Sequence, residues 1–127
     1  MSKYKTVKEN REFARAYRRG KSCVSAVLVT YVLKTRGSDL RYGITTGKKV
    51  GNAVKRSRAR RVIRASYYQL FHQIKPGYTI IFVARGKTPY VKSQVVCKAM
   101  RQHLKTLGLL TDRIEDVKNE KAAAHTD

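Results

Sequence analysis

Residues 47–64 read GKKVGNAVKRSRARRVIR, and they carry the strongest structural signal in the chain. Gly51 and Asn52 predict a turn, in which the Asn52 side chain can cap the following helix by accepting a bond from a free backbone N–H. From there to Ile74 the apolar residues recur at helical spacing, which predicts a helix with one buried stripe. The stripe is formed by Ala59, Val62, Ile63, Ser66, Leu70 and Ile74.

The opposite side of this helix is strongly basic, with Ser57, Arg60, Arg61, Arg64 and Tyr68 predicted to lie on it. Acids normally occupy the first turn of a helix because they oppose the macrodipole, yet this helix opens on cations. Like charges on one turn repel, so we expect a polyanion such as a phosphate backbone to neutralise them. Residues 47–64 contain no acid, and their basic residues are Lys48, Lys49, Lys55, Arg56, Arg58, Arg60, Arg61 and Arg64.

The charge of the whole chain agrees with this interpretation. Its 127 residues carry a formal net charge of +21, and no carboxylate lies between Asp39 and Asp112, although sixteen Lys and Arg do. Charged surfaces normally mix both signs, so this distribution favours a polyanion-binding surface over a merely soluble basic protein. The length predicts a single domain, placed at residues 1–111, and the polar, acidic residues 112–127 are predicted to form a disordered tail.

Several functional classes are disfavoured. Cys23 and Cys97 show no Cys-x-x-Cys spacing, which argues against a metal finger or a disulfide framework and favours a reducing, cytoplasmic setting. No signal peptide is predicted, and no apolar stretch approaches the roughly 18 residues of a membrane span. The acid-free centre offers no carboxylate pair and no phosphate-binding loop, and His72 and His103 lack a partner. We therefore expect neither catalytic side chains nor a protein metal site.

The first helix is predicted over residues 7–19. Thr6 and Glu9 fit a capping box at its start, and Gly20 fits a stop at its end. Phe13 and Tyr17 share one helical face, with arginines around them. Two interpretations are open: both rings belong to an ordinary core, or they form an aromatic platform for unpaired bases.

Strands and a last helix complete the pattern. Residues 22–34 predict one strand or two, and residues 40–46 predict a strand that pairs with them as an antiparallel hairpin. Residues 78–84 predict a central strand, and residues 90–107 predict a helix. The expected architecture is an α+β fold in the order α-β-β-β-α-β-α. Its small, mainly antiparallel sheet is backed by helices on one face and leaves the other face for an open cleft.

Three segments now carry a family resemblance. LRYG at residues 40–43, KKVGNAV at residues 48–54 and RSRARRVIR at residues 56–64 resemble the signature of the bacterial ribonuclease P protein subunit. The first helix, with Phe13 and Tyr17, is similar to the family's first helix. The resemblance extends over residues 1 to about 108, and its central motif is long and unusual.

The resemblance implies a fold like that of ribosomal protein S5 domain 2, with a left-handed β-α-β crossover that contains the basic helix. It also implies a partnership with the catalytic ribonuclease P RNA, expected at 1:1, and with precursor tRNA, whose 5′ leader the enzyme removes. The RNA would carry the bond-breaking chemistry and hold Mg²⁺. No cofactor bound by the protein alone, no membrane and no further protein partner are expected.

Site residues follow from the same resemblance. The leader-binding cleft is expected at Phe13, Tyr17 and Tyr31. In one place the chain departs from the family, because Ser57 stands where the family usually has Asn; serine is shorter and lacks the amide. Contact with the RNA subunit is expected from Lys48, Lys49, Asn52, Lys55, Arg56, Ser57, Arg58, Arg60, Arg61 and Arg64.

Two other functions compete with the subunit of a ribonucleoprotein enzyme. A structural ribosomal-type protein would use the same basic face on ribosomal RNA, without an effect on precursor tRNA. An autonomous nuclease would cleave RNA without an RNA subunit, which the missing catalytic groups give no reason to expect.

Overall fold

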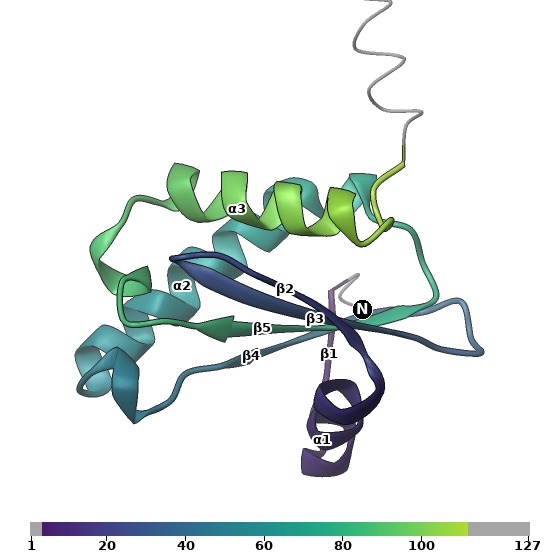
Figure 1. Cartoon of the computed structure of the whole chain (residues 1–127), viewed down its shortest axis with the longest axis horizontal. Coiled ribbons are helices and arrows are strands. Elements are labelled where there is room, and N and C mark those ends of the chain that lie inside the picture. The colour runs from purple at the N-terminus through teal and green to yellow at the C-terminus, as the bar shows by residue number, and fades with distance from the viewer. Residues whose placement is uncertain (1–3, 112–127) are drawn as a thin grey trace, which may run out of the picture.

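The computed structural model describes residues 4–111, so the tail predicted at 112–127 lies outside the described residues. Within that range the chain forms a five-stranded sheet and three α-helices, which confirms the α+β class (Figure 1). No helix of this part is long and apolar enough to cross a bilayer. The elements are β1 (Lys5–Thr6), α1 (Asn10–Arg19), β2 (Lys21–Val24), β3 (Leu28–Lys34), β4 (Leu40–Thr45), η1 (Lys48–Val50), α2 (Ala53–Leu70), η2 (Phe71–Gln73), β5 (Tyr78–Ala84), η3 (Thr88–Tyr90) and α3 (Ser93–Thr106).

The sheet is mixed, with strand order β1-β4-β5-β3-β2. β2 pairs with β3 and β3 with β5 in antiparallel fashion, whereas β1 with β4 and β4 with β5 are parallel pairs. The prediction of a mainly antiparallel sheet with a β3–β4 hairpin was therefore wrong. β5 is apolar on both faces and lies at the centre of the sheet, between β4 and β3. The β3–β4 turn spans the start of β5, where Thr35 N–H donates to Gly77 O and Gly77 N–H donates to Asp39 O.

The first helix begins later than predicted. Thr6 belongs to β1, which the sequence did not reveal, and Val7 N–H donates to Tyr42 O. Glu9 is the N-cap residue and makes no side-chain cap bond, so the capping box was wrong. Gly20 does end the helix as its C-cap residue. Glycine is required there because a Cβ would lie 2.5 Å from Ala16 O and 2.6 Å from Val32 O.

The basic helix begins as predicted, where Asn52 Oδ1 accepts the Lys55 N–H at 3.0 Å. It ends at Leu70 and not at Ile74 as predicted, and η2 follows it directly. Its predicted stripe is buried except for Val62, which is half-buried. α2 and α3 cover one face of the sheet, and α1 lies across part of the other, which is therefore not wholly open (Figure 1). The main core lies between the sheet and α2 and α3, with Leu28, Ile63 and Phe82 fully buried. Each such side chain contributes about 1.5–3 kcal/mol.

A smaller core lies beneath α1. Val7, Ala16 and Ile81 are buried there, with Phe13 and Tyr31 packed against them. This cluster fixes α1 on the sheet face opposite α2. The aromatic side chains of α1 are consequently held at the edge of a core and close to solvent.

Candidate nucleic-acid interface

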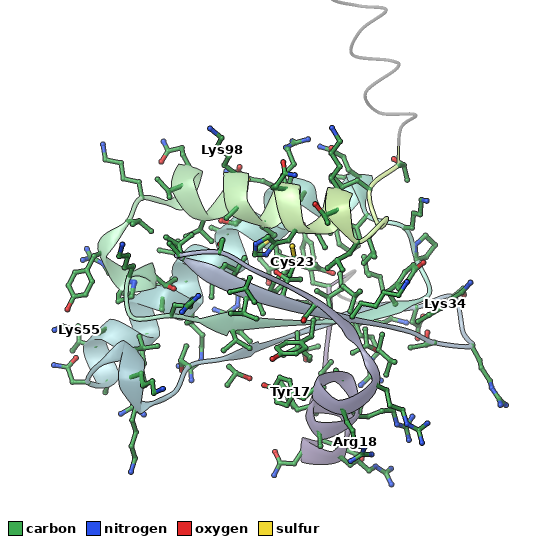
Figure 2. The ribbon with its side chains drawn as sticks, viewed as in Figure 1. Tyr17, Arg18, Cys23, Lys34, Lys55 and Lys98 are labelled. Carbon is green, nitrogen blue, oxygen red and sulfur yellow. The ribbon has the colours of Figure 1, made fainter. Side chains whose placement is uncertain are left out.

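A tight turn sets up the start of the basic helix. Gly51 has a φ of 133°, a conformation that L side chains rarely adopt, and a Cβ there would lie 2.7 Å from Lys55 Cδ. The turn joins η1, which carries exposed Lys48 and Lys49, to the capped first turn of α2. Cations before and inside the helix start are thereby brought to one end of the molecule, where Figure 2 shows Lys55.

The predicted RNA-binding residues are accessible. Lys48, Lys49, Asn52, Ser57, Arg58, Arg60 and Arg61 are exposed, whereas Lys55, Arg56 and Arg64 are half-buried. Within residues 4–111 the ion pairs are Lys5–Asp39, Arg11–Glu9 and Arg41–Glu12, so none engages α2. Across the same range Arg56 Nε is buried without a hydrogen-bond partner. The positive charge of α2 is thus left uncompensated by the described part of the chain.

The cations of α2 occupy two flanks of the helix. On one flank Arg60 Nη2 donates to Thr46 Oγ1 at 2.9 Å, just after β4. On the other flank Arg58 and Arg61 line hollows shared with the start of α3. A helix packed by one stripe against a sheet has two solvent-facing borders, and arginines stand on both.

Two tyrosines, Tyr42 of β4 and Tyr68 of α2, lie near Arg64 of α2. The hydroxyls of Tyr42 and Tyr68 share a hydrogen bond of 3.1 Å. Burial, followed by the bond to Tyr68, raises the pKa of Tyr42 to about 12, although Arg64 acts in the opposite direction. Burial also raises the pKa of Tyr67. Both rings therefore remain neutral near pH 7 and add no negative charge beneath the arginines.

A second candidate surface lies between α1 and the sheet. The rings of Tyr17 and Tyr31 meet edge to face, with centroids 4.9 Å apart. Tyr17 is 40% exposed, and Figure 2 shows it beside α1. Phe13 is half-buried and stands over Gly43, where a Cβ would lie 2.8 Å from its ring. Tyr31 faces α1 rather than the main core. The structure thus brings together all three predicted aromatic residues.

The sheet extends this aromatic surface with residues that sequence reasoning missed. Side chains of paired strand residues point to the same face. The register therefore places two rows on the α1 face, which are Gly43, Ile81, Tyr31 and Ser22, then Thr45, Val83, Val29 and Val24. Alternation along each strand shows which of its residues share a face, but only the pairing shows which of them lie beside Tyr31.

The two surfaces meet at the end of β4. Tyr17 and Thr45 share a hydrogen bond of 2.8 Å between their hydroxyls, and the next residue, Thr46, accepts the bond from Arg60. Two consecutive threonines therefore form hydrogen bonds with the aromatic Tyr17 of α1 and with the cationic Arg60 of α2. A single extended polyanion could contact both surfaces around this strand end.

Two groups that could perform chemistry, His103 and Cys97, are buried or half-buried. His103 donates or accepts a bond of 2.9 Å with Thr30 in the core, and burial lowers its pKa. Burial likewise raises the pKa of the Cys97 thiol, which disfavours the reactive thiolate. Residues 4–111 contain no group of three or more His, Cys, Asp or Glu that could hold a metal ion.

An α+β fold with an uncompensated arginine helix beside an aromatic surface defines a nucleic-acid-binding protein. The family model described as Ribonuclease P matches residues 1–108. The chain is 40% identical over 111 residues to the ribonuclease P protein component of Clostridium novyi, covering 86% of this chain and 98% of that protein. It is 36% identical over 102 residues to that of Clostridioides difficile, covering 80% and 90%. The chain belongs to the ribonuclease P protein family.

Solved structures agree with this assignment. The Staphylococcus aureus RNase P protein superposes with a TM-score of 0.74 at 27% identity, covering 84% of this chain and 97% of that one. The Thermotoga maritima RNase P protein gives a TM-score of 0.69 at 23% identity, covering 81% and 94%, and supports the fold. The mixed five-stranded sheet with three helices is thus the fold of this family.

Proposed function

We propose that the chain is the protein subunit of ribonuclease P. It binds the catalytic RNA through α2 and the residues before it, and it binds the 5′ leader of precursor tRNA on the aromatic surface of Phe13, Tyr17 and Tyr31. The RNA performs the cleavage, so no residue of this chain acts on the scissile bond. The observation that carries the proposal is the junction at Thr45 and Thr46, which joins an arginine flank to an aromatic surface.

Binding of the RNA subunit rests on arginine chemistry. A guanidinium donates paired, charge-assisted bonds to phosphate, each contributing about 1.5–3 kcal/mol. Phosphate also removes the mutual repulsion of cations that the described residues leave unpaired. Ser57 is exposed in the first turns of α2 and offers a short hydroxyl in this contact. We place one protein on each RNA, in the cytoplasm.

Leader binding rests on stacking. An aromatic side chain contributes about 1–3 kcal/mol for each stacked base, with little sequence preference, which suits leaders of varied sequence. Tyr17 offers its exposed ring, and Tyr31 supports it edge to face. Phe13 anchors the surface to the small core.

The proposal extends to Mg²⁺ and to the crossover. Mg²⁺ keeps its waters and prefers phosphate oxygens, so the RNA holds it and the protein lowers the concentration required by screening phosphate repulsion. α2 connects the parallel strands β4 and β5. We propose that this crossover is left-handed, as in ribosomal protein S5 domain 2, against the usual right-handed rule.

Cleavage of a precursor tRNA at low magnesium tests the proposal. A bacterial ribonuclease P RNA is assayed with and without the protein, beside a control with protein alone. Stimulation that needs both the RNA subunit and the leader supports the proposed role. Tight RNA binding without stimulation would overturn it in favour of a structural RNA-binding protein, and cleavage by protein alone would overturn the assignment of chemistry to the RNA.

A further inference from the structure

Tyr90 is an aromatic side chain that the proposed function does not use. It ends η3, between β5 and α3, and 65% of its surface is exposed, more than for Tyr17 at 40%. Lys55 of α2 holds its Nζ 5.2 Å from the centre of the Tyr90 ring. Lys55 therefore lies over one face of the ring, and the exposed remainder of the ring is typical of a site that stacks a flat ligand.

A groove runs from Tyr90 along the second flank of α2. Its volume is about 460 Å³, and it continues into a neighbouring hollow of about 280 Å³ that adds Arg61 and Ala65. None of the lining residues is acidic. The groove is lined by Arg58, Val62, Pro89, Tyr90, Val91, Lys92, Ser93 and Gln94.

The groove combines the two parts that a nucleotide needs. Tyr90 offers a flat apolar face for a base, while Arg58 and Lys92 offer charge for the adjacent phosphates. Lys92 is also the N-cap of α3 and makes no side-chain cap bond, so the first backbone N–H groups of that helix remain available to an anion. A folded RNA duplex would present phosphates but no free base, which makes an unpaired nucleotide the better fit.

The position of the groove shows which RNA would supply that nucleotide. α2 and η3 contact each other, and Figure 1 shows the start of α2 beside the connection from β5 to α3. Arg58 belongs both to α2 and to the groove wall. The aromatic surface of Tyr17 lies instead on the α1 face of the sheet. The groove therefore continues the α2 interface and not the proposed leader surface.

We propose that the Tyr90 groove binds an unpaired nucleotide of the RNA subunit, with its base stacked on Tyr90 and its phosphate held by Arg58 and Lys92. This inference rests on the proposed function, because α2 must first bind that RNA. It adds a stacking contact to an interface that is otherwise electrostatic. Stacking and phosphate contacts differ in salt dependence, so the two can be separated.

The first test measures the affinity of ribonuclease P RNA for Tyr90→Ala at several salt concentrations. Loss of one stacked base should weaken binding about five- to 150-fold, with the slope of log Kd against log salt unchanged. Tyr90→Phe keeps the ring and should bind like the parent protein. Arg58→Ala, by contrast, should reduce the slope.

The second test uses a reporter that the chain lacks, because it contains no tryptophan. Tyr90→Trp places one indole in the groove. Ribonuclease P RNA should quench its emission and protect it from acrylamide, as expected of a stacked ring. Unchanged affinity of Tyr90→Ala together with unchanged Tyr90→Trp emission, while the parent protein binds RNA tightly, would overturn the inference alone. Failure of the parent protein to bind this RNA would overturn the proposed function and the inference together.

Discussion

Replacing Arg60 and Arg61 with alanine tests the central assignment most directly. Both side chains are exposed, and no described acid pairs with them. Arg60 already donates one hydrogen bond to Thr46. We therefore use the lower end of the energy range for a hydrogen bond to a charged group, about 1.5 kcal/mol for each arginine. The pair then contributes about 3 kcal/mol, and the double variant should bind ribonuclease P RNA roughly 150-fold more weakly.

Salt dependence gives a second readout of the same change. Each lost phosphate contact lowers the slope of log K against log salt by about 0.7–0.9, so the double variant should lose roughly 1.4–1.8. Filter binding or fluorescence anisotropy between about 50 and 200 mM salt measures this slope. The midpoint of thermal unfolding should not fall, because removing two like charges relieves repulsion.

A matched control removes the same charge elsewhere. Lys34 and Arg36 are exposed at the β3–β4 turn, and Figure 2 shows Lys34 at the end of the molecule opposite Lys55. Lys34→Ala with Arg36→Ala should therefore change the RNA affinity far less. If both double variants lose affinity equally, net charge and not α2 governs binding, and our reasoning is refuted.

Three further predictions concern the aromatic surface and the core. Gly43→Ala places a Cβ 2.8 Å from the Phe13 ring, and should lower the free energy of unfolding in urea by about 1–3 kcal/mol and weaken leader binding. Tyr17→Ala should weaken binding of precursor tRNA to the holoenzyme by about 1–3 kcal/mol while sparing mature tRNA, and Tyr17→Phe should retain most of it. Because burial lowers the pKa of His103, the unfolded chain binds the proton more readily, so stability should fall as pH drops below about 6.5.

Controls for these predictions come from the same chain. A Cβ at Gly47 meets no atom within 4 Å, so Gly47→Ala should leave stability unchanged. If Tyr17→Ala weakened the binding of mature tRNA and of precursor tRNA equally, Tyr17 would not bind the leader. Thermal melts from pH 7.5 to about 5 should show a flatter profile of stability against pH for His103→Gln. If the dependence of stability on pH were unchanged in His103→Gln, groups other than His103 would cause the loss of stability in acid.

Much of the candidate site could be predicted because its signals are local. The cap at Asn52, the apolar stripe of α2 and the concentration of arginines all lie within one helix, where spacing alone defines the faces. Gly20 as a helix end and β5 as a central strand are likewise short-range patterns. The prediction of an α+β fold followed from their order.

Strand pairing could not be read in this way, because the partners lie far apart in the chain. β1 is only Lys5–Thr6, and what defines it is its parallel pairing with β4. The same pairing takes Thr6 away from the capping role that its neighbours suggest. Likewise, β5 separates β3 from β4, since a strand that is apolar on both faces is best covered in the middle of the sheet.

By itself the sequence determined a basic, capped helix, three aromatic candidates and the family to which they belong. The tertiary structure alone decided that Tyr31 faces α1, that arginines divide between two flanks of α2, and that Tyr90 opens onto one of them. It also placed Tyr17 and Arg60 on the neighbouring residues Thr45 and Thr46. The physical reason is that helical periodicity is set within a few residues, whereas register and long-range contacts arise only when distant segments bury their apolar faces together.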